Sequence, residues 1–149
     1  MEKLRASAKE AYSLKLNCIK TQNSNFFDPD LNVTLDGEVT VTEDTADNGG
    51  VNLAYRAYKK WLETNQSAQS YLIALDYTPE KLFWISYAQF YCSVQREELK
   101  RSLFESKEVH SFDRFRVLGP LMNSIDFSRD FACPDLSFMN TDRKKCIVW

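Results

Sequence analysis

Three separate stretches of this chain carry the residue pattern of an α-helix, and they limit its fold more than any other feature. They are residues 2–21, about 43–63 and 78–105 of the 149 residues. Only four Gly and four Pro occur, while 13% of the residues are aromatic, which excludes disordered and collagen-like classes. A chain of this length can bury roughly 68–70% of its unfolded surface. We therefore expect one mainly α-helical soluble domain.

The charge balance narrows the possible partners. The chain has 19 Lys and Arg against 21 Asp and Glu, so it lacks the cationic excess of a nucleic-acid binder. No apolar run approaches the length of a membrane span, and the charged residues 1–10 do not form a secretory signal. Two glycosylation sequons, Asn32-Val33-Thr34 and Asn65-Gln66-Ser67, and an even set of four cysteines nevertheless hint at an exported ancestry.

In the first half of the chain we expect a lead helix and loop over 1–30, followed by a hairpin and a long helix over 31–63. Residues 31–35 and 39–41 alternate around Asp36-Gly37, which predicts the hairpin. Thr40 or Thr42 is expected to cap the helix that follows. Small residues on one side of that helix predict a close neighbour. These residues, together with two larger ones on the same side, are Ala46, Gly50, Leu53, Ala54, Ala57 and Trp61.

In the second half, a polar stretch over 64–76 leads to Thr78-Pro79-Glu80, a cap followed by Pro at the first helical position. Up to residue 94, apolar residues then occur on nearly all sides of the expected helix, and a charged continuation follows. We therefore expect a buried helix over 78–105. Residues 106–149 are expected to form a loop around His110, a helical turn over 116–122, a short amphipathic piece over 124–131 and an aperiodic tail.

The residues that could carry chemistry each allow two interpretations. Glu43 and Asp47 lie one turn apart on one helix face, where they fit either a metal shell or an acidic first turn that complements the helix dipole. His110, the single imidazole, is by default a surface or packing residue. The aromatic cluster that includes Phe90 and Tyr91 is by default core, and forms a substrate pocket only if the fold places it in a cleft.

Taken in order, several blocks of the sequence resemble the carboxyl-terminal part of the neprilysin and endothelin-converting-enzyme family of zinc metalloendopeptidases. The resemblance extends from about Cys18 to the last residue. The blocks are EDTADNGG at 43–50, AYRAY at 54–58, SYAQFYC at 86–92, VHS at 109–111, FRVLG at 115–119, MN at 139–140 and CIVW at 146–149. Five or more such blocks in the same order are hard to obtain by accident.

The resemblance implies that 1–149 is a single partial domain, a helical portion of the carboxyl-terminal lobe of such a peptidase, with zinc as cofactor and peptides as substrates. It implies that Glu43 is the third zinc ligand and that Asp47 orients a ligating imidazole through its second ring nitrogen. A carboxylate at Glu43 suits zinc, which accepts oxygen ligands in catalytic sites.

The same resemblance implies roles for residues further along the chain. His110 would hydrogen-bond the oxyanion of the tetrahedral intermediate, and Arg116 would bind backbone carbonyls of the substrate. Phe90 and Tyr91 would line the pocket for the residue just after the scissile bond. Glu108 and Phe112 depart from the usual family residues beside the histidine.

The largest departure is the missing His-Glu-x-x-His motif, since the chain contains one histidine in total. Only one zinc ligand of three is present, which implies a missing amino-terminal portion that carries the others. We therefore expect a truncated fragment that does not hydrolyse peptides alone. The alternatives are a non-catalytic peptide- or partner-binding module, that is, a pseudoenzyme, and a chain that does not fold stably without its neighbour.

By the family pattern Cys18 pairs with Cys146, a bridge that encloses most of the chain. Cys92 and Cys133 would bond to cysteines near the start of the full enzyme. In their absence these two thiols stay free, pair with each other or pair across chains. The resemblance also implies a plasma-membrane ectodomain or a secreted protein, and it implies no nucleic-acid partner.

Overall fold

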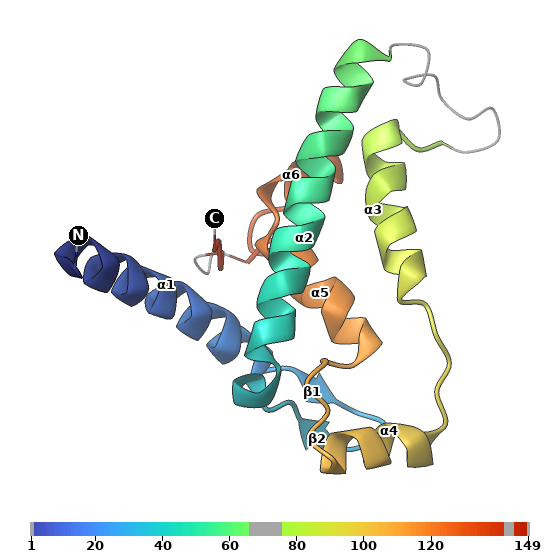
Figure 1. The fold of residues 1–149 in the computed structure, drawn as a ribbon. Coiled ribbons are helices and arrows are strands. Elements are labelled where there is room, and N and C mark those ends of the chain that lie inside the picture. Colours follow the sequence, from blue (N-terminus) through green and yellow to red (C-terminus); the bar gives the residue numbers. More distant parts are fainter. Residues whose placement is uncertain (1, 66–75, 142–144, 149) are drawn as a thin grey trace.

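A computed structural model describes residues 2–65, 76–141 and 145–148 of the chain, and in these residues the protein is mainly helical, as expected (Figure 1). Six helices and one small antiparallel pair of strands make up the described fold. Their bounds are α1 Glu2–Asn23, β1 Phe27–Asp28, β2 Val33–Thr34, α2 Gly37–Thr64, α3 Pro79–Phe90, α4 Glu97–Glu105, α5 Asp113–Asn123 and α6 Ile125–Asp130.

Helix α2 is the element around which the others are arranged. Its 28 residues extend about 42 Å at 1.5 Å per residue. Helices α1, α3 and α5 contact it at different heights (Figure 1). The main hydrophobic cluster lies between α2, α3, α5 and α6, and its buried members are Val51, Tyr55, Trp84, Leu121 and Phe127.

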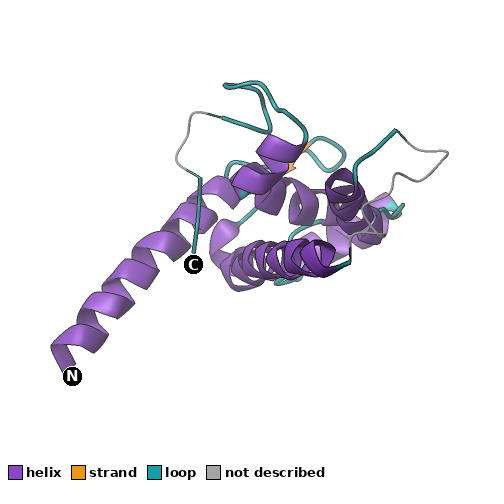
Figure 2. Ribbon diagram, turned by 90° about the horizontal axis from the view of Figure 1, so that it is seen from above, coloured by secondary structure: helices purple, strands orange, loops and turns teal. Residues whose placement is uncertain are grey.

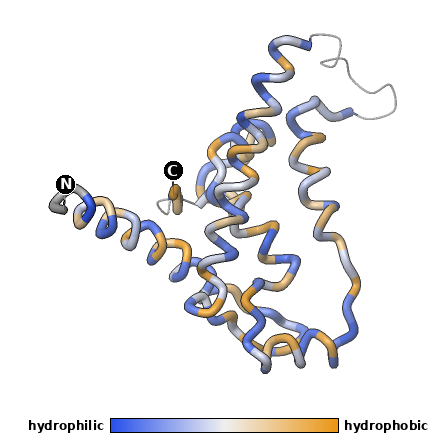
Figure 3. The backbone as a smooth tube through the Cα atoms, viewed as in Figure 1, coloured by the Kyte–Doolittle hydropathy of each residue, from blue (hydrophilic) through white to orange (hydrophobic). Residues whose placement is uncertain are grey.

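Helix α1 packs against the rest of the described fold at its carboxyl end. Ile19 forms a buried cluster with Cys146 and Val148, and a disulfide joins Cys18 to Cys146 across 128 positions of sequence. Residues 5–14 are exposed, and this part of α1 projects from the body (Figure 2). Hydrophilic and apolar residues alternate along it (Figure 3). The amphipathic helix is therefore present, but most of its length has no cover within the described residues.

The strand pair lies earlier in the chain than the sequence predicts. Phe27 pairs with Thr34 and Asp28 with Val33, so the turn is residues 29–32 and the first strand falls in the expected lead loop. A small hairpin before the Glu43 helix is confirmed, but its expected placement about Asp36-Gly37 is wrong. Apolar residues alternate there because Leu35 is buried and because one side of the following helix is buried. A short sequence window does not distinguish this pattern from that of a strand.

Asp36-Gly37 instead begins α2. The Asp36 carboxylate accepts a hydrogen bond from the Glu38 backbone N–H at 3.0 Å, so Asp36 is the cap and the expected cap at Thr40 or Thr42 is wrong. A Cβ at Gly37 would lie 2.3 Å from the Lys20 carbonyl oxygen. The glycine is thus required by the close approach of α1 to α2.

The single buried helix expected over 78–105 is two helices, α3 and α4, separated by residues 91–96. Its start is confirmed: Thr78 caps α3, and Pro79 is its first residue. The expected burial is wrong, because only Trp84 of α3 is buried and Phe90 is 82% exposed. One side of α3 packs against α2 and α6, while no described element covers its other side.

The region after His110 is more helical than expected, because α5 covers 11 residues where a single turn was predicted. The expected amphipathic piece is α6, capped by the Ser124 hydroxyl. Most of the expected polar linker over 64–76 lies outside the described residues. Among the helices that are described, none combines the length and the apolar character that crossing a bilayer requires.

Candidate functional site

The structure brings most of the candidate residues together at the amino-terminal turns of α2. Glu43 and Asp47 come from α2, His110 from the loop between α4 and α5, and Arg116 from α5. Tyr91 joins them from the end of α3. The two α2 residues are more than 40 positions away in sequence from the other three, so the gathering is a product of the fold.

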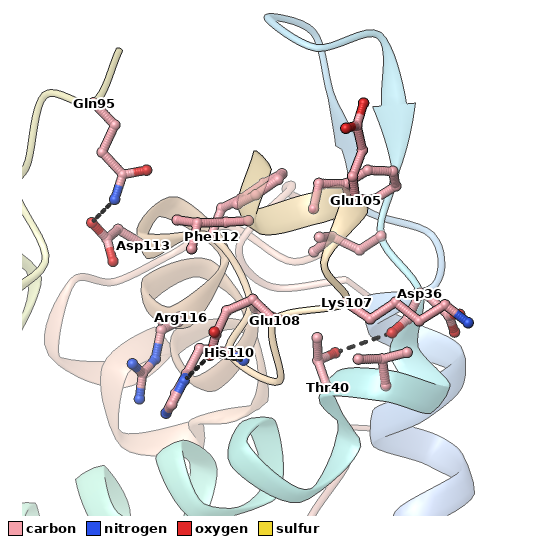
Figure 4. A pocket seen from close by; sticks show the side chains of 15 residues that line it. Asp36, Thr40, Gln95, Glu105, Lys107, Glu108, His110, Phe112, Asp113 and Arg116 are labelled. Atoms are coloured by element: carbon pink, nitrogen blue, oxygen red, sulfur yellow. Dashed lines mark hydrogen bonds and ion pairs between the residues drawn. The ribbon is translucent and has the colours of Figure 1, made fainter. Parts of the chain in front are cut away.

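His110 lies between two carboxylates. Its Nδ1 lies 2.7 Å from Glu108 Oε1, and its Nε2 lies 3.3 Å from Glu43 Oε2. A carboxylate can only accept, so Nδ1 donates its proton to Glu108 in this contact. Figure 4 shows the His110 ring bonded to Glu108 at the edge of a pocket. The hydrogen bond from His110 lowers the pKa of the Glu108 carboxyl.

Asp47 and Arg116 form a two-pronged ion pair. Arg116 Nε lies 2.7 Å from Asp47 Oδ2, and a terminal guanidinium nitrogen lies 2.8 Å from Oδ1. These hydrogen bonds raise the pKa of Arg116 further above its usual value. The guanidinium also lies over the Tyr91 ring, 4.9 Å from its centre, and the Tyr91 hydroxyl donates to Asp47 Oδ1 at 3.4 Å. Asp47 is therefore bound to an arginine within this chain.

The position of Arg116 depends on a proline one turn further along α5. Pro120 lies inside the helix and has no N–H to donate to the Arg116 carbonyl four residues before it. The Tyr87 hydroxyl of α3 donates to that carbonyl instead, at 2.8 Å. Burial raises the pKa of Tyr87, which keeps the donating proton in place. This contact fixes α3 against α5 beside the ion pair.

Sequence reasoning missed the residue that holds the His110 loop against α2. Asp44 is only 3% exposed, and its carboxylate accepts hydrogen bonds from the Thr40 hydroxyl at 2.6 Å and the Ser111 hydroxyl at 2.7 Å. Burial raises the pKa of this carboxyl. The spacing of Thr40 and Asp44 could have signalled the first bond, but no local pattern signals the bond to Ser111, which is 67 positions away. We refer to Thr40, Asp44 and Ser111 as the loop clasp.

A cavity of about 420 Å³ opens beside His110 and Arg116 (Figure 4). It lies between the start of α2, α4 and the loop that carries His110. Its walls are mainly apolar, and charged side chains stand at its rim. The apolar wall residues are Leu35, Val39, Leu103, Phe104 and Phe112. The cavity is suited to an apolar side chain that is held near a charged surface.

Some candidate residues are not part of this gathering. Phe90 points its edge at the Tyr91 ring but is otherwise exposed, and it does not line the cavity. Cys92 is a free, exposed thiol, and Cys133 is a free, half-buried thiol that packs against the main cluster. The two are not bonded to each other; pairing with a cysteine of another chain stays a prediction.

The donors present do not fit a complete zinc centre. Catalytic zinc takes three protein ligands, commonly two of them imidazoles in a peptidase. The whole chain offers one histidine, and both of its ring nitrogens face carboxylates. Within the parts of the chain that the structure describes, no three His, Cys, Asp or Glu side chains are grouped to hold a metal ion. Glu43 can supply one ligand.

Comparisons with known proteins find a matching family and similar sequences. The model of the family described as Peptidase family M13 matches residues 1–147. Neprilysin-2 of Drosophila melanogaster is 43% identical over 141 residues, which is 94% of this chain and 18% of the relative. Human endothelin-converting enzyme 1 is 40% identical over 146 residues, and rabbit (Oryctolagus cuniculus) neprilysin 40% over 115. Those matches cover 96% and 77% of this chain but only 18% and 15% of the relatives, so the chain spans under a fifth of their length.

Proposed function

Since this chain belongs to peptidase family M13, we propose that it is the carboxyl-terminal part of a zinc metalloendopeptidase that hydrolyses peptide bonds. The gathering of Glu43, Asp47, His110 and Arg116 at one end of α2 is the observation that carries this proposal. Because the chain spans under a fifth of the length of these relatives, we assign the His-Glu-x-x-His motif to a separate portion of the protein.

In the assembled enzyme, bound zinc would polarise the scissile carbonyl and activate a water molecule. Glu43 would supply one ligand to it, and Asp47 would accept a hydrogen bond from the imidazole of another ligand. His110 lies 3.3 Å from Glu43, so a donor to a developing oxyanion would stand beside the metal. These roles require Glu43 and Asp47 to exchange part of their present bonding for partners from the other portion.

Arg116 keeps donors free for a substrate. A guanidinium has five N–H groups, and Asp47 engages two of them. The remaining N–H groups can donate to a peptide carbonyl while the Asp47 pair holds the guanidinium in place. Tyr91, stacked against the same guanidinium, and Phe90 beside it would form the wall of the pocket for the residue that follows the scissile bond.

The 149-residue chain alone is expected to lack peptidase activity, because one zinc ligand of three cannot build the centre. The test incubates the purified chain with Zn²⁺ and a fluorogenic peptide, with and without the remaining portion of the Drosophila relative. We expect hydrolysis only in the mixture. Glu43→Gln should abolish it, whereas Glu63→Gln, an exposed change on the same helix, should not. Metal-dependent turnover by the chain alone would refute the proposal.

We also propose that the protein is exported, as a plasma-membrane ectodomain or in secreted form. The Cys18–Cys146 disulfide supports this, because such bonds persist in oxidising compartments and are rare in the cytosol. Blocking free thiols in the source cells, followed by mass measurement with and without reductant, tests the redox state. A reduced pair in the protein from its natural source would contradict export.

The cavity beside His110 supports a second candidate, a non-catalytic module that binds peptides or a partner chain. Its apolar walls and charged rim suit an apolar peptide side chain. A labelled peptide should then bind the chain without cleavage. Phe104→Ala in the wall should weaken binding at least tenfold, whereas Phe138→Ala, away from this cavity, should not. Peptide binding unaffected by either change would argue against this cavity as the site.

A further inference from the structure

The tip of the small hairpin presents an asparagine with an exposed side chain. Asn32 is the last residue of the turn over 29–32, and its φ of 56° lies in the left-handed region, which asparagine tolerates better than most residues. Its side chain makes no hydrogen bond to any residue that the structure describes. The amide is thus available to react without breaking a folded contact.

The two residues after Asn32 complete an acceptor sequence for N-linked glycosylation. Val33 is the middle residue, and Thr34 supplies the hydroxyl at the third position. Thr34 is exposed on the second strand, opposite Phe27. Asn32 at the end of the turn and Thr34 on the strand are therefore both exposed, while Val33 is half-buried, so a large hydrophilic group on Asn32 can extend into solvent.

The second sequon of the chain differs in its surroundings. The Asn65 amide nitrogen donates to the Trp61 carbonyl at 2.9 Å and to the Thr64 hydroxyl at 3.0 Å, at the carboxyl end of α2. A sugar on this nitrogen would break these contacts at the helix terminus. The third residue of that sequon, Ser67, lies outside the described residues.

We propose that Asn32 is an N-glycosylation site, an inference that rests on the export proposed above. The donor is an oligosaccharide linked to a lipid through a pyrophosphate. Asn32 Nδ2 forms a bond to the anomeric carbon of the first sugar, the bond from that carbon to the pyrophosphate breaks, and Nδ2 loses one proton. No oxidation or reduction takes place.

The base of the turn is held by hydrogen bonds and ion pairs. The Leu31 backbone N–H donates to Asp28 Oδ1 at 3.0 Å. The Lys100 ammonium of α4 donates to Asp28 at 2.5 Å and to Asp30 at 2.9 Å. Asn32 does not line the cavity at His110. A glycan there would leave the candidate site open and would keep this turn facing solvent in a longer protein.

The test expresses the full chain behind a cleavable signal peptide in secretory eukaryotic cells. A reporter sequon added at the amino terminus reports delivery to the compartment of transfer. Lysate and medium are both treated with endoglycosidase, so a chain retained in the cell is also read. Asn32→Asp, which keeps tolerance of the left-handed region, and Thr34→Val should each remove the shift of one glycan. Thr34→Ser and Asn65→Asp should keep it.

Mass spectrometry of the peptide that contains residue 32, after enzymatic release in heavy-oxygen water, should show conversion to a labelled aspartate. An occupied reporter with an unmodified Asn32 would overturn the proposal, as would a glycan found on Asn65 alone. If the experiment is repeated with two different signal peptides and the reporter sequon still carries no glycan, the proposal is also overturned, because the chain would then not enter the secretory pathway. None of these readouts uses peptidase activity, so failure here and failure of the proposed hydrolysis remain distinct.

Discussion

The two faces of α2 differ in how completely this chain covers them. The inner face is buried against α1, α5 and α6, and two of its polar side chains have partners from other segments: Asp44 is held in the loop clasp, and the Asn48 amide oxygen accepts from Asn123 at 2.8 Å. The outer face is open, and Trp61 on it is 49% exposed. The exposed outer-face residues are Ala46, Gly50, Leu53, Ala54, Ala57 and Trp61.

The contrast teaches that a helix face suited to close packing does not itself show what will pack there. Apart from its own helix, no described atom lies within 4 Å of the position that a Cβ would take at Gly50. At 100° per residue, Glu43 lies at the same angle as Trp61 on the outer face, and Asp47 lies about 40° away from it, toward the inner face. Glu43 lies against His110 with its side chain 35% exposed, whereas Asp47, whose side chain is 10% exposed, is paired with Arg116.

The strongest test of the covered side is removal of the disulfide, which holds α1 and the chain end against α2. Replacing both Cys18 and Cys146 with Ser should lower the free energy of unfolding by up to about 5 kcal/mol, because the unfolded chain regains the freedom of a very long loop. Denaturant titration measures this. Cys92→Ser, at an exposed free thiol, is the control and should change stability little. A double variant as stable as the parent would contradict the assignment.

The next largest loss of stability is expected from a change in the loop clasp. Asp44→Ala removes the acceptor of two buried hydroxyls, each costing about 1–3 kcal/mol when left unpaired. We expect a loss of about 2–4 kcal/mol in thermal or denaturant unfolding, with greater amide exchange in the His110 loop. Asp44→Asn keeps the shape and one acceptor and removes a buried charge, so it should stay within about 1 kcal/mol of the parent. Equal effects from the two changes would argue against the clasp.

On the outer face we expect a substitution to stabilise the chain instead of destabilising it. Gly50→Ala should stabilise the chain by about 0.5–1 kcal/mol, because alanine loses less conformational entropy in a helix and meets no neighbour. Gly37→Ala is the matched control at the start of the same helix and should destabilise, because its Cβ would collide with the Lys20 carbonyl. Thermal unfolding distinguishes the two. Destabilisation by Gly50→Ala would show that the outer face is covered, for example by a second copy.

The smallest expected effect lies where α2 meets α3. Lys59 and Glu80 form an ion pair at 2.7 Å, and the hydrogen bond from Lys59 lowers the pKa of Glu80 from 4.5. The pKa of Glu80 is lower in the folded state than in the unfolded state, so the folded chain binds fewer protons at this carboxyl. The contribution of the pair to stability is therefore present above pH 4.5 and is lost as the pH falls through the folded-state pKa. Glu80→Gln should cost about 0.2–1 kcal/mol at pH 7 and nothing in strong acid. A difference that persists in acid would assign the effect to packing.

Local patterns predicted elements better than their boundaries. The cap at Thr78-Pro79 is a local hydrogen-bonding pattern, and it is confirmed. Asp36-Gly37 also begins an element, but both a tight turn and a helix start use this dipeptide, and the choice was made by the contact with α1. The break between α3 and α4 has no glycine or proline to mark it, so an apolar run joined them in the prediction.

The candidate site was predictable to the extent that its residues occur in recognisable blocks. Spacing alone placed Glu43 and Asp47 on one helix face, and the resemblance to a peptidase family named His110 and Arg116. The Asp47–Arg116 pair and the Asp44–Ser111 bond of the loop clasp were not predictable, because each joins groups 67 or more positions apart. Phe90 was expected beside the site, but within the described residues it stays largely exposed.

By itself the sequence determined the helical class, the start of α3 and the family, because these depend on short-range periodicity and on residue identity. Only the tertiary structure decided which carboxylates are buried, what each is bonded to and which face of α2 is left open. Those outcomes depend on distances between segments far apart in the chain, and burial changes the energy of a charged group far more than its sequence neighbours do.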